Sequence, residues 1–223
     1  MIYLKYLPAI SLWFIFGFYF ACTKSKPQPY LLVLHEDNNM EFLNKKGMTK
    51  LQLSKSLDSL IKINGKIYLM LDIEQETSYN EFYKIRKILQ KYRDNLLIGL
   101  KKNGKVISFF KISEEPDIKD IKKYNKNQII KINKSKADKF IINQDSTITK
   151  ADLKQALLKE AERSILNYNK TLIFLINISK ESNATYGEYE YIGNELIKAI
   201  NTLKNRHKEI KTKIVELQNV NLM

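Results

Sequence analysis

Cysteine, histidine, glycine and proline are all scarce in this 223-residue chain. The single cysteine, Cys22, excludes a framework of internal disulfides. The two histidines, His35 and His207, stand far apart and have no cysteine companions, whereas a zinc site needs three or four converging ligands. With only 7 Gly and 4 Pro, long flexible linkers are not expected. The sequence therefore predicts folded units without a metal centre.

Arginine is also scarce, although the chain carries 38 Lys and Arg residues and a formal net charge of +14. Only Arg86, Arg93, Arg163 and Arg206 are arginines. Recognition of phosphates and bases favours the planar, bidentate arginine fork, so we expect no nucleic-acid partner. A surplus of lysine instead favours attraction to membrane lipids with anionic headgroups, worth about 1 kcal/mol per cation near the surface.

Motifs that carry catalysis are missing as well. The sequence has no glycine-rich phosphate loop, no nucleophile with a base at a recognisable spacing and no metal-ligand motif. At 44% hydrophobic and 28% charged, the composition is that of a folded protein. We therefore expect a protein that is not an enzyme and that uses no cofactor.

The longest uncharged run lies near the N-terminus, from Tyr6 to Cys22, with Lys5 before it and Lys24 after it. As a helix it would span about 25 Å, close to the thickness of a bilayer core. One interpretation is a transmembrane anchor over residues 1–26, and the other is a lipoprotein signal in which Cys22, after the small Ala21, becomes lipidated. Both interpretations place the rest of the chain outside the cytoplasm.

Beyond this run, one order of signals occurs twice. Short apolar strands are predicted over 30–34 and 41–43, a helix after the N-cap candidate Thr49, a strand over 67–71, a helix over 80–92 and a strand over 96–100. One hundred residues after Thr49, Thr149 opens a similar helix, preceded by a strand over 140–142 and followed by a strand over 172–178 and a closing helix over 188–211. An internal repeat is informative about the fold. We therefore predict an α+β protein with two tandem small domains of the order β-β-α-β-α-β, after an N-terminal transmembrane helix.

The boundaries follow from the same signals. The first domain is predicted over 30–113, including an apolar strand over 106–112. A lysine-rich connecting segment follows over 114–138, which contains a further short strand candidate at 129–132. The second domain is predicted over 139–223.

The second repeat carries a more specific pattern. Glu181 is followed by Thr-Tyr-Gly-Glu-Tyr, in which Tyr186 and Gly187 open the closing helix. The first repeat has a weaker copy, with Glu74 and Tyr79 at the same spacing but without the glycine. This pattern resembles the C-terminal signature of the ExbD/TolR family of biopolymer-transport proteins. Leu7-Pro8 at the start of the apolar run and Lys26-Pro27-Gln28 after it are also similar to that family.

The resemblance implies a function and partners. It implies a single-pass inner-membrane protein with a periplasmic bulk, which couples or scaffolds transport driven by the proton-motive force. The implied partners are an ExbB/TolQ-like channel subunit, a TonB-like or other periplasmic protein, and further copies of the chain. In the family, an Asp three residues after the proline carries protons, and here that position is Ser11, whose hydroxyl does not titrate near neutral pH. We therefore expect that this chain carries no protons itself.

Two interpretations remain open for the motif residues and for the function. Tyr79 and Tyr186 either line a ligand groove or pack in the interior. Glu74 and Glu181 either form a catalytic pair or occupy the approach to a helix N-terminus, which favours a carboxylate. The alternative function, from the lipoprotein interpretation, is an envelope module that binds a ligand or a peptide. In either case, we expect a sheet edge to bind an extended peptide by strand addition.

Overall fold

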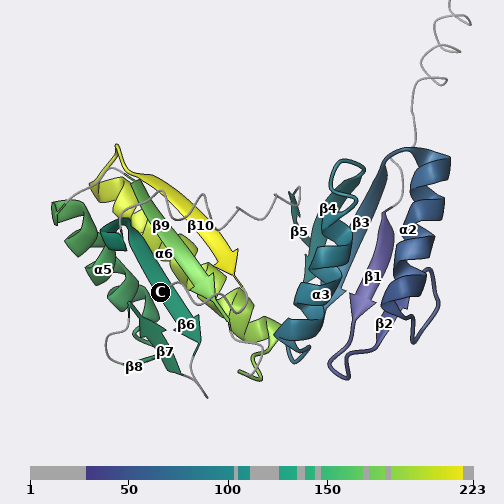
Figure 1. Ribbon diagram of the computed structural model, residues 1–223, viewed down its shortest axis with the longest axis horizontal. Coiled ribbons are helices and arrows are strands. Elements are labelled where there is room, and N and C mark those ends of the chain that lie inside the picture. The colour runs from purple at the N-terminus through teal and green to yellow at the C-terminus, as the bar shows by residue number, and fades with distance from the viewer. Residues whose placement is uncertain are drawn as a thin grey trace, which may run out of the picture.

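The chain forms two α/β units that lie side by side and meet where one helix of each unit begins (Figure 1). The computed structural model describes residues 29–102, 105–110, 126–134, 139–143, 147–167, 171–178 and 182–217. The first unit comprises the described residues up to 110, and the second unit those from 126 onward. Each unit has one five-stranded sheet.

The sheet of the first unit has the strand order β2-β1-β3-β4-β5. Strands β1 (Tyr30–Leu34), β3 (Ile67–Ile73) and β4 (Leu96–Lys102) are parallel to one another, whereas β2 (Met40–Phe42) and β5 (Lys105–Phe110) run antiparallel along the two edges. The parallel connections need crossover helices. These are α2 (Lys50–Asn64), which leads into β3, and α3 (Tyr79–Gln90), which leads into β4.

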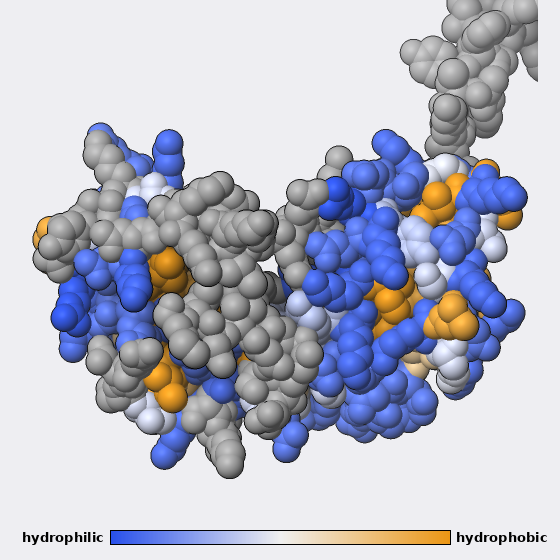
Figure 2. All heavy atoms as spheres, viewed as in Figure 1, coloured by the Kyte–Doolittle hydropathy of each residue, from blue (hydrophilic) through white to orange (hydrophobic). Residues whose placement is uncertain are grey.

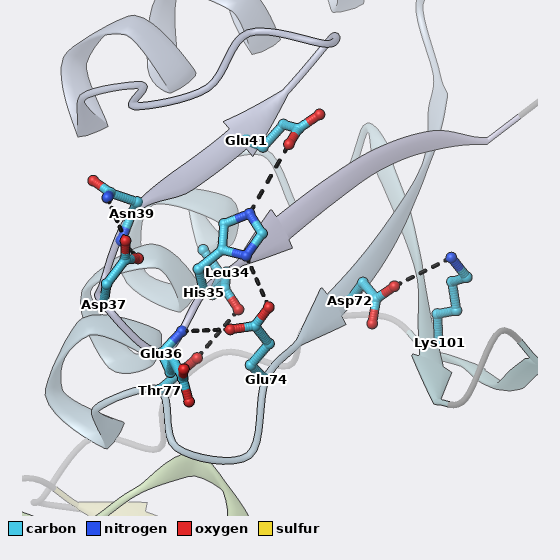
Figure 3. Close-up of polar contacts among 10 residues, drawn as sticks. All are labelled: Leu34, His35, Glu36, Asp37, Asn39, Glu41, Asp72, Glu74, Thr77 and Lys101. Carbon is cyan, nitrogen blue, oxygen red and sulfur yellow. Dashed lines mark hydrogen bonds and ion pairs between the residues drawn. The ribbon is translucent and has the colours of Figure 1, made fainter.

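Both helices cover the same face of this sheet. The register pairs Leu32 with Leu71 and Leu69 with Ile98, so alternate residues of β1, β3 and β4 point to one side. On that side they share a core with the buried faces of α2 and α3, which are Leu53, Leu57, Tyr79, Phe82, Ile85 and Leu89. The opposite side is partly polar, and there the Lys101 ammonium lies 3.2 Å from the Asp72 carboxylate (Figure 3). Figure 2 shows a mainly hydrophilic surface over this unit.

The second unit repeats this plan with the strand order β10-β9-β6-β7-β8. It contains β6 (Ile129–Lys134) after a short 3-10 turn η1 (Lys126–Gln128), then β7 (Lys139–Ile142), β8 (Thr147–Thr149), α5 (Leu153–Asn167), β9 (Thr171–Asn177), α6 (Tyr186–Arg206) and β10 (Lys211–Leu217). Strand β6 lies between β9 and β7, although the sequence placed it in the connecting segment. The second unit therefore begins before residue 139.

The two units correspond residue by residue. Ile132 pairs with Ile142 as Leu32 pairs with Phe42, and Leu153 and Leu157 are buried as Leu53 and Leu57 are. The buried stripe of α3 (Tyr79, Phe82, Ile85, Leu89) has the same spacing as Tyr186, Tyr189, Ile192 and Leu196 in α6. Each unit therefore contains elements in the order β-β-α-β-α-β, with one strand beyond that predicted order: β5 follows β4 in the first unit, and β8 precedes α5 in the second.

Two expectations need correction. The predicted fold class included an N-terminal transmembrane helix, but in the part of the chain that the structure describes, no helix is both long and apolar enough to cross a bilayer. The run from Tyr6 to Cys22 itself lies outside the described residues. The closing helix was predicted to continue to residue 211, but it ends at Arg206. After residues 207–210 the chain enters the seven-residue strand β10, which is parallel to β9.

The helix caps differ between the units and give a first test. Thr185 and Glu188 form a capping box at α6, whereas Ser78, the equivalent of Thr185 at α3, makes no side-chain hydrogen bond to its helix. We expect Thr185→Ala to lower the free energy of unfolding by about 1 kcal/mol and Ser78→Ala to lower it by a few tenths of that. Urea unfolding followed by circular dichroism measures both. Equal losses in the two variants would contradict this account of the caps.

Candidate interaction site at the junction of the two units

The two units are joined by their strand-helix loops. The backbone N–H of Tyr79 donates to the carbonyl oxygen of Ala184 at 2.8 Å, and the N–H of Tyr186 donates to the carbonyl oxygen of Thr77 at 2.7 Å. Between them, Ser78 and Thr185 form an antiparallel bridge. Because Thr77 corresponds to Ala184 and Tyr79 to Tyr186, the two hydrogen bonds are related by an approximate two-fold axis.

Gly187 gives room for this close approach. Its N–H donates to the carbonyl oxygen of Gln75 at 2.8 Å, and a Cβ atom at residue 187 would lie 3.1 Å from that oxygen and 2.5 Å from the Gln75 Oε1. The Gln75 side chain in turn donates to the Glu190 carboxylate at 2.8 Å. The Tyr-Gly pattern that the sequence singled out thus serves a contact between the repeats.

Aromatic rings from both helices pack behind the loops. The ring centroids of Tyr79 and Tyr189 are 5.2 Å apart, and those of Phe82 and Tyr186 are 4.9 Å apart. Tyr79 is 2% exposed and Tyr186 is 7% exposed. The two motif tyrosines are therefore brought together by the fold, and they form the interior of the junction rather than the wall of a ligand groove.

The junction tyrosines are poorly suited to acid-base chemistry. Burial, together with the nearby Glu190 carboxylate, raises the pKa of Tyr186 above its ordinary value. Burial also raises the pKa of Tyr189. Both phenols therefore remain protonated at neutral pH.

Glu74 has a structural role at the start of the first loop. Its carboxylate accepts the backbone N–H of Glu36 at 2.7 Å and lies 2.8 Å from the Nδ1 atom of His35 (Figure 3). These contacts lower the pKa of Glu74, the backbone N–H of Glu36 contributing most and His35 next. Since Thr77 also donates its hydroxyl to the Leu34 carbonyl oxygen, the loop is tied to the end of β1 at two points. Glu181, the proposed second acid, lies outside the described residues, as do Ser11 and Cys22.

A polar groove of about 470 Å³ borders the junction. It is lined by the Gln75 loop, the first turns of α6 and Lys150. Two of its carboxylates are already engaged, because Glu188 lies 2.9 Å from the Lys134 ammonium and Glu190 accepts from Gln75. In the described segments, no three His, Cys, Asp or Glu residues are placed to hold a metal ion.

Strand β10 forms one edge of the second sheet. Strand β4 has β5 on its outer side, but no strand among the described residues pairs with the corresponding side of β10. Ile98 of β4 and Ile214 of β10 are equivalent, since they pair with the equivalent residues Leu69 and Phe174. Ile98 is 0% exposed, whereas Ile214 is 45% exposed. The missing neighbour thus leaves an apolar side chain open at this edge.

Sequence reasoning did not find this edge, because it extended the preceding helix to residue 211. The β-branched residues Thr212, Ile214 and Val215 were the signal that could have found β10. No protein-family model, curated protein or solved structure matches the chain. The resemblance to ExbD/TolR therefore stays a prediction.

Gly187 and Gly193 provide a matched pair of variants in one helix. A Cβ atom at Gly193 meets nothing within 4 Å, so Gly193→Ala is expected to stabilise α6 by up to about 1 kcal/mol through helix propensity. Gly187→Ala forces the Gln75 loop away, and we expect a protein about 1–2 kcal/mol less stable than Gly193→Ala. Thermal unfolding compares the two, and amide exchange at Tyr79 should accelerate only in Gly187→Ala. Equal stabilities with unchanged exchange would refute the close-approach argument.

The hydrogen bonds of Glu74 predict a pH dependence. Its pKa is lowered below 4.5 in the folded protein, so its contribution is present above about pH 4.5 and is lost as the pH falls through the folded pKa. The side chain is 45% exposed, so we expect less than about 1 kcal/mol. Urea midpoints of the unaltered protein and Glu74→Gln should differ at pH 6, and the difference should shrink as the pH falls below 4.5 through the folded pKa. Glu76→Gln, two residues along the loop, is the control, and a Glu76→Gln profile identical to that of Glu74→Gln would contradict the assignment.

Proposed function

We propose that this protein is a non-catalytic scaffold or coupling component, of the kind that the resemblance to ExbD/TolR implies, and that it binds an extended segment of a partner along β10. The partner strand adds antiparallel to β10, as β5 adds to β4 in the first unit. The observation that carries the proposal is the exposure of Ile214 in place of the fully buried Ile98.

The geometry of the first unit supports this mode of binding. The pairing of β4 with β5 places Ile98 opposite Phe110 and Leu100 opposite Ser108, so the equivalent side of the fold accepts an antiparallel strand. In strand addition, backbone hydrogen bonds supply affinity, and alternate side chains supply specificity. A strand beside β10 would cover Ile214, which removes apolar surface from water.

The carboxylates and phenols whose pKa values are shifted in the described residues support a binding role. General acid-base catalysis needs groups whose pKa values lie near the operating pH. The shifts in these groups move pKa values away from neutral pH. The pKa values of Glu74, Glu81 and Glu162 are lowered, and those of Tyr186 and Tyr189 are raised.

A synthetic peptide with the sequence of Lys105–Phe110 is the probe that tests the proposal, because this sequence already pairs with the equivalent strand. We expect the peptide to slow amide hydrogen exchange over residues 211–217 severalfold, as measured by mass spectrometry on the full chain. Ile214→Lys should remove this protection. Ile63→Lys, a change at a side chain of α2 that is 79% exposed, should not.

Two results would overturn the proposal. One is an absence of protection at 211–217 at millimolar peptide. The other is slow exchange along the whole of β10 without any peptide, because it would mean that this edge is already occupied in the free protein.

A further inference from the structure

Strand β10 presents two lysines beside its exposed isoleucine. Lys211 and Lys213 are both exposed, and they alternate with Ile214 along the strand. Ile214 pairs with Phe174 of the core, so it lies on the side of the sheet that the helices cover. Successive side chains of a strand point to opposite sides, so both lysines point to the side away from the helices.

The covered strand of the first unit has no charge at the equivalent places. We counted back along β4 and β10 from their equivalent isoleucines. Leu97 of β4 then corresponds to Lys213. Two residues further back, Asn95 corresponds to Lys211. The two lysines therefore occur beside the open edge and are missing beside the edge that β5 covers.

The charge at the start of β10 is mainly positive. Among the described strand residues on this side of the second sheet none is acidic, and the charged ones are Lys131, Lys139, Lys211 and Lys213. The turn before β10 contributes one exposed acid, Glu209, and one exposed lysine, Lys208. The acid within β10, Glu216, pairs with Ile176 toward the other end of the strand. A strand beside the first half of β10 would therefore meet an excess of cations.

This charge restricts which strands can pair here. Opposite charges placed across from one another stabilise an antiparallel pair, and like charges destabilise it. Lysine on an open edge also deters pairing with the wrong strand. A second copy of the chain offers no compensating acid, because two β10 strands that pair about Ile214 would place Val215 and Leu217 opposite the lysines.

We propose that β10 selects an extended partner segment that has an apolar residue followed by acidic residues at the first and third positions after it. This inference rests on the proposed function and adds the chemistry of the partner. The apolar residue lies opposite Ile214, as Phe110 lies opposite Ile98 in the first unit. Because the partner runs antiparallel, its next residue lies opposite Lys213 and its third lies opposite Lys211.

Three peptides separate the position of the acids from the total charge. The first is acetyl-Lys-Val-Ile-Ser-Phe-Phe-Glu-Thr-Glu-amide, which begins with the sequence of Lys105–Phe110. The second has the same composition but carries Glu-Thr-Glu at its amino end, and the third carries Lys-Thr-Lys in place of Glu-Thr-Glu. Each is titrated at low salt into the full chain, and amide exchange over residues 211–217 is followed by mass spectrometry. We expect the first peptide to bind about fivefold more tightly than the second and about tenfold more tightly than the third.

A pair of double variants gives the control on the protein. Lys211→Gln with Lys213→Gln should remove the preference for the first peptide. Lys55→Gln with Lys62→Gln, which changes two exposed lysines of α2 and lowers the net charge equally, should keep it. The peptide series on the unaltered protein decides the question if the β10 variant folds poorly.

The outcomes distinguish this inference from the proposed function. Equal binding of the first two peptides, or a preference that persists in the β10 double variant, would overturn the selection of acidic residues and leave strand addition in place. An absence of protection at 211–217 with all three peptides would overturn strand addition itself.

Discussion

The rest of the structure depends on the pairing of two loops, in which Tyr79 and Tyr186 each donate a backbone hydrogen bond across the junction. Buried backbone groups need partners, and here each repeat satisfies the groups of the other. The pairing also sets where α3 and α6 begin, and hence how their aromatic side chains meet. Glycine at residue 187 eases this approach, since a Cβ atom there would lie 3.1 Å from the Gln75 carbonyl oxygen. One short contact thus couples the caps, the aromatic interior and the relative position of the two sheets.

Two equivalent units on one chain can diverge where the common fold does not constrain them. The core positions of α2 and α5 are both leucines, and the stripes of α3 and α6 keep the same spacing. The differences lie at the margins. Leu34 stands where Lys134 makes an internal ion pair, and Ile98 is fully buried in β4, which pairs with β5, whereas the equivalent Ile214 of the edge strand β10 remains exposed. The two units therefore share their core but differ at these two margins.

Much of the fold could be predicted from local pattern. The N-cap Thr49, the apolar stripe of α2 and the recurrence of Tyr-x-x-aromatic spacing at Tyr79 and Tyr186 are short-range signals, and the structure contains the elements they indicate. Strand β10 was missed because charged and apolar residues after Arg206 also fit a continuing helix. Strand β6 was assigned to a connection because its place in the sheet depends on a pairing with β9, more than forty residues away in the chain, that local sequence does not reveal. The junction, which joins residues over one hundred positions apart, was beyond any local signal.

The charged groups of this protein hold local geometry and attract opposite charge. Lysine supplies most of the net charge of +14, and it is a flexible, strongly hydrated cation that favours adaptable contacts over fixed bidentate ones. Where a carboxylate is held, as at Glu81 and Glu162, neighbouring cations keep it ionised rather than ready to donate a proton. Such groups stabilise geometry and attract opposite charge, but they do not exchange protons near neutral pH. The proposed recognition of a partner strand needs only such fixed charge, an open sheet edge and apolar surface.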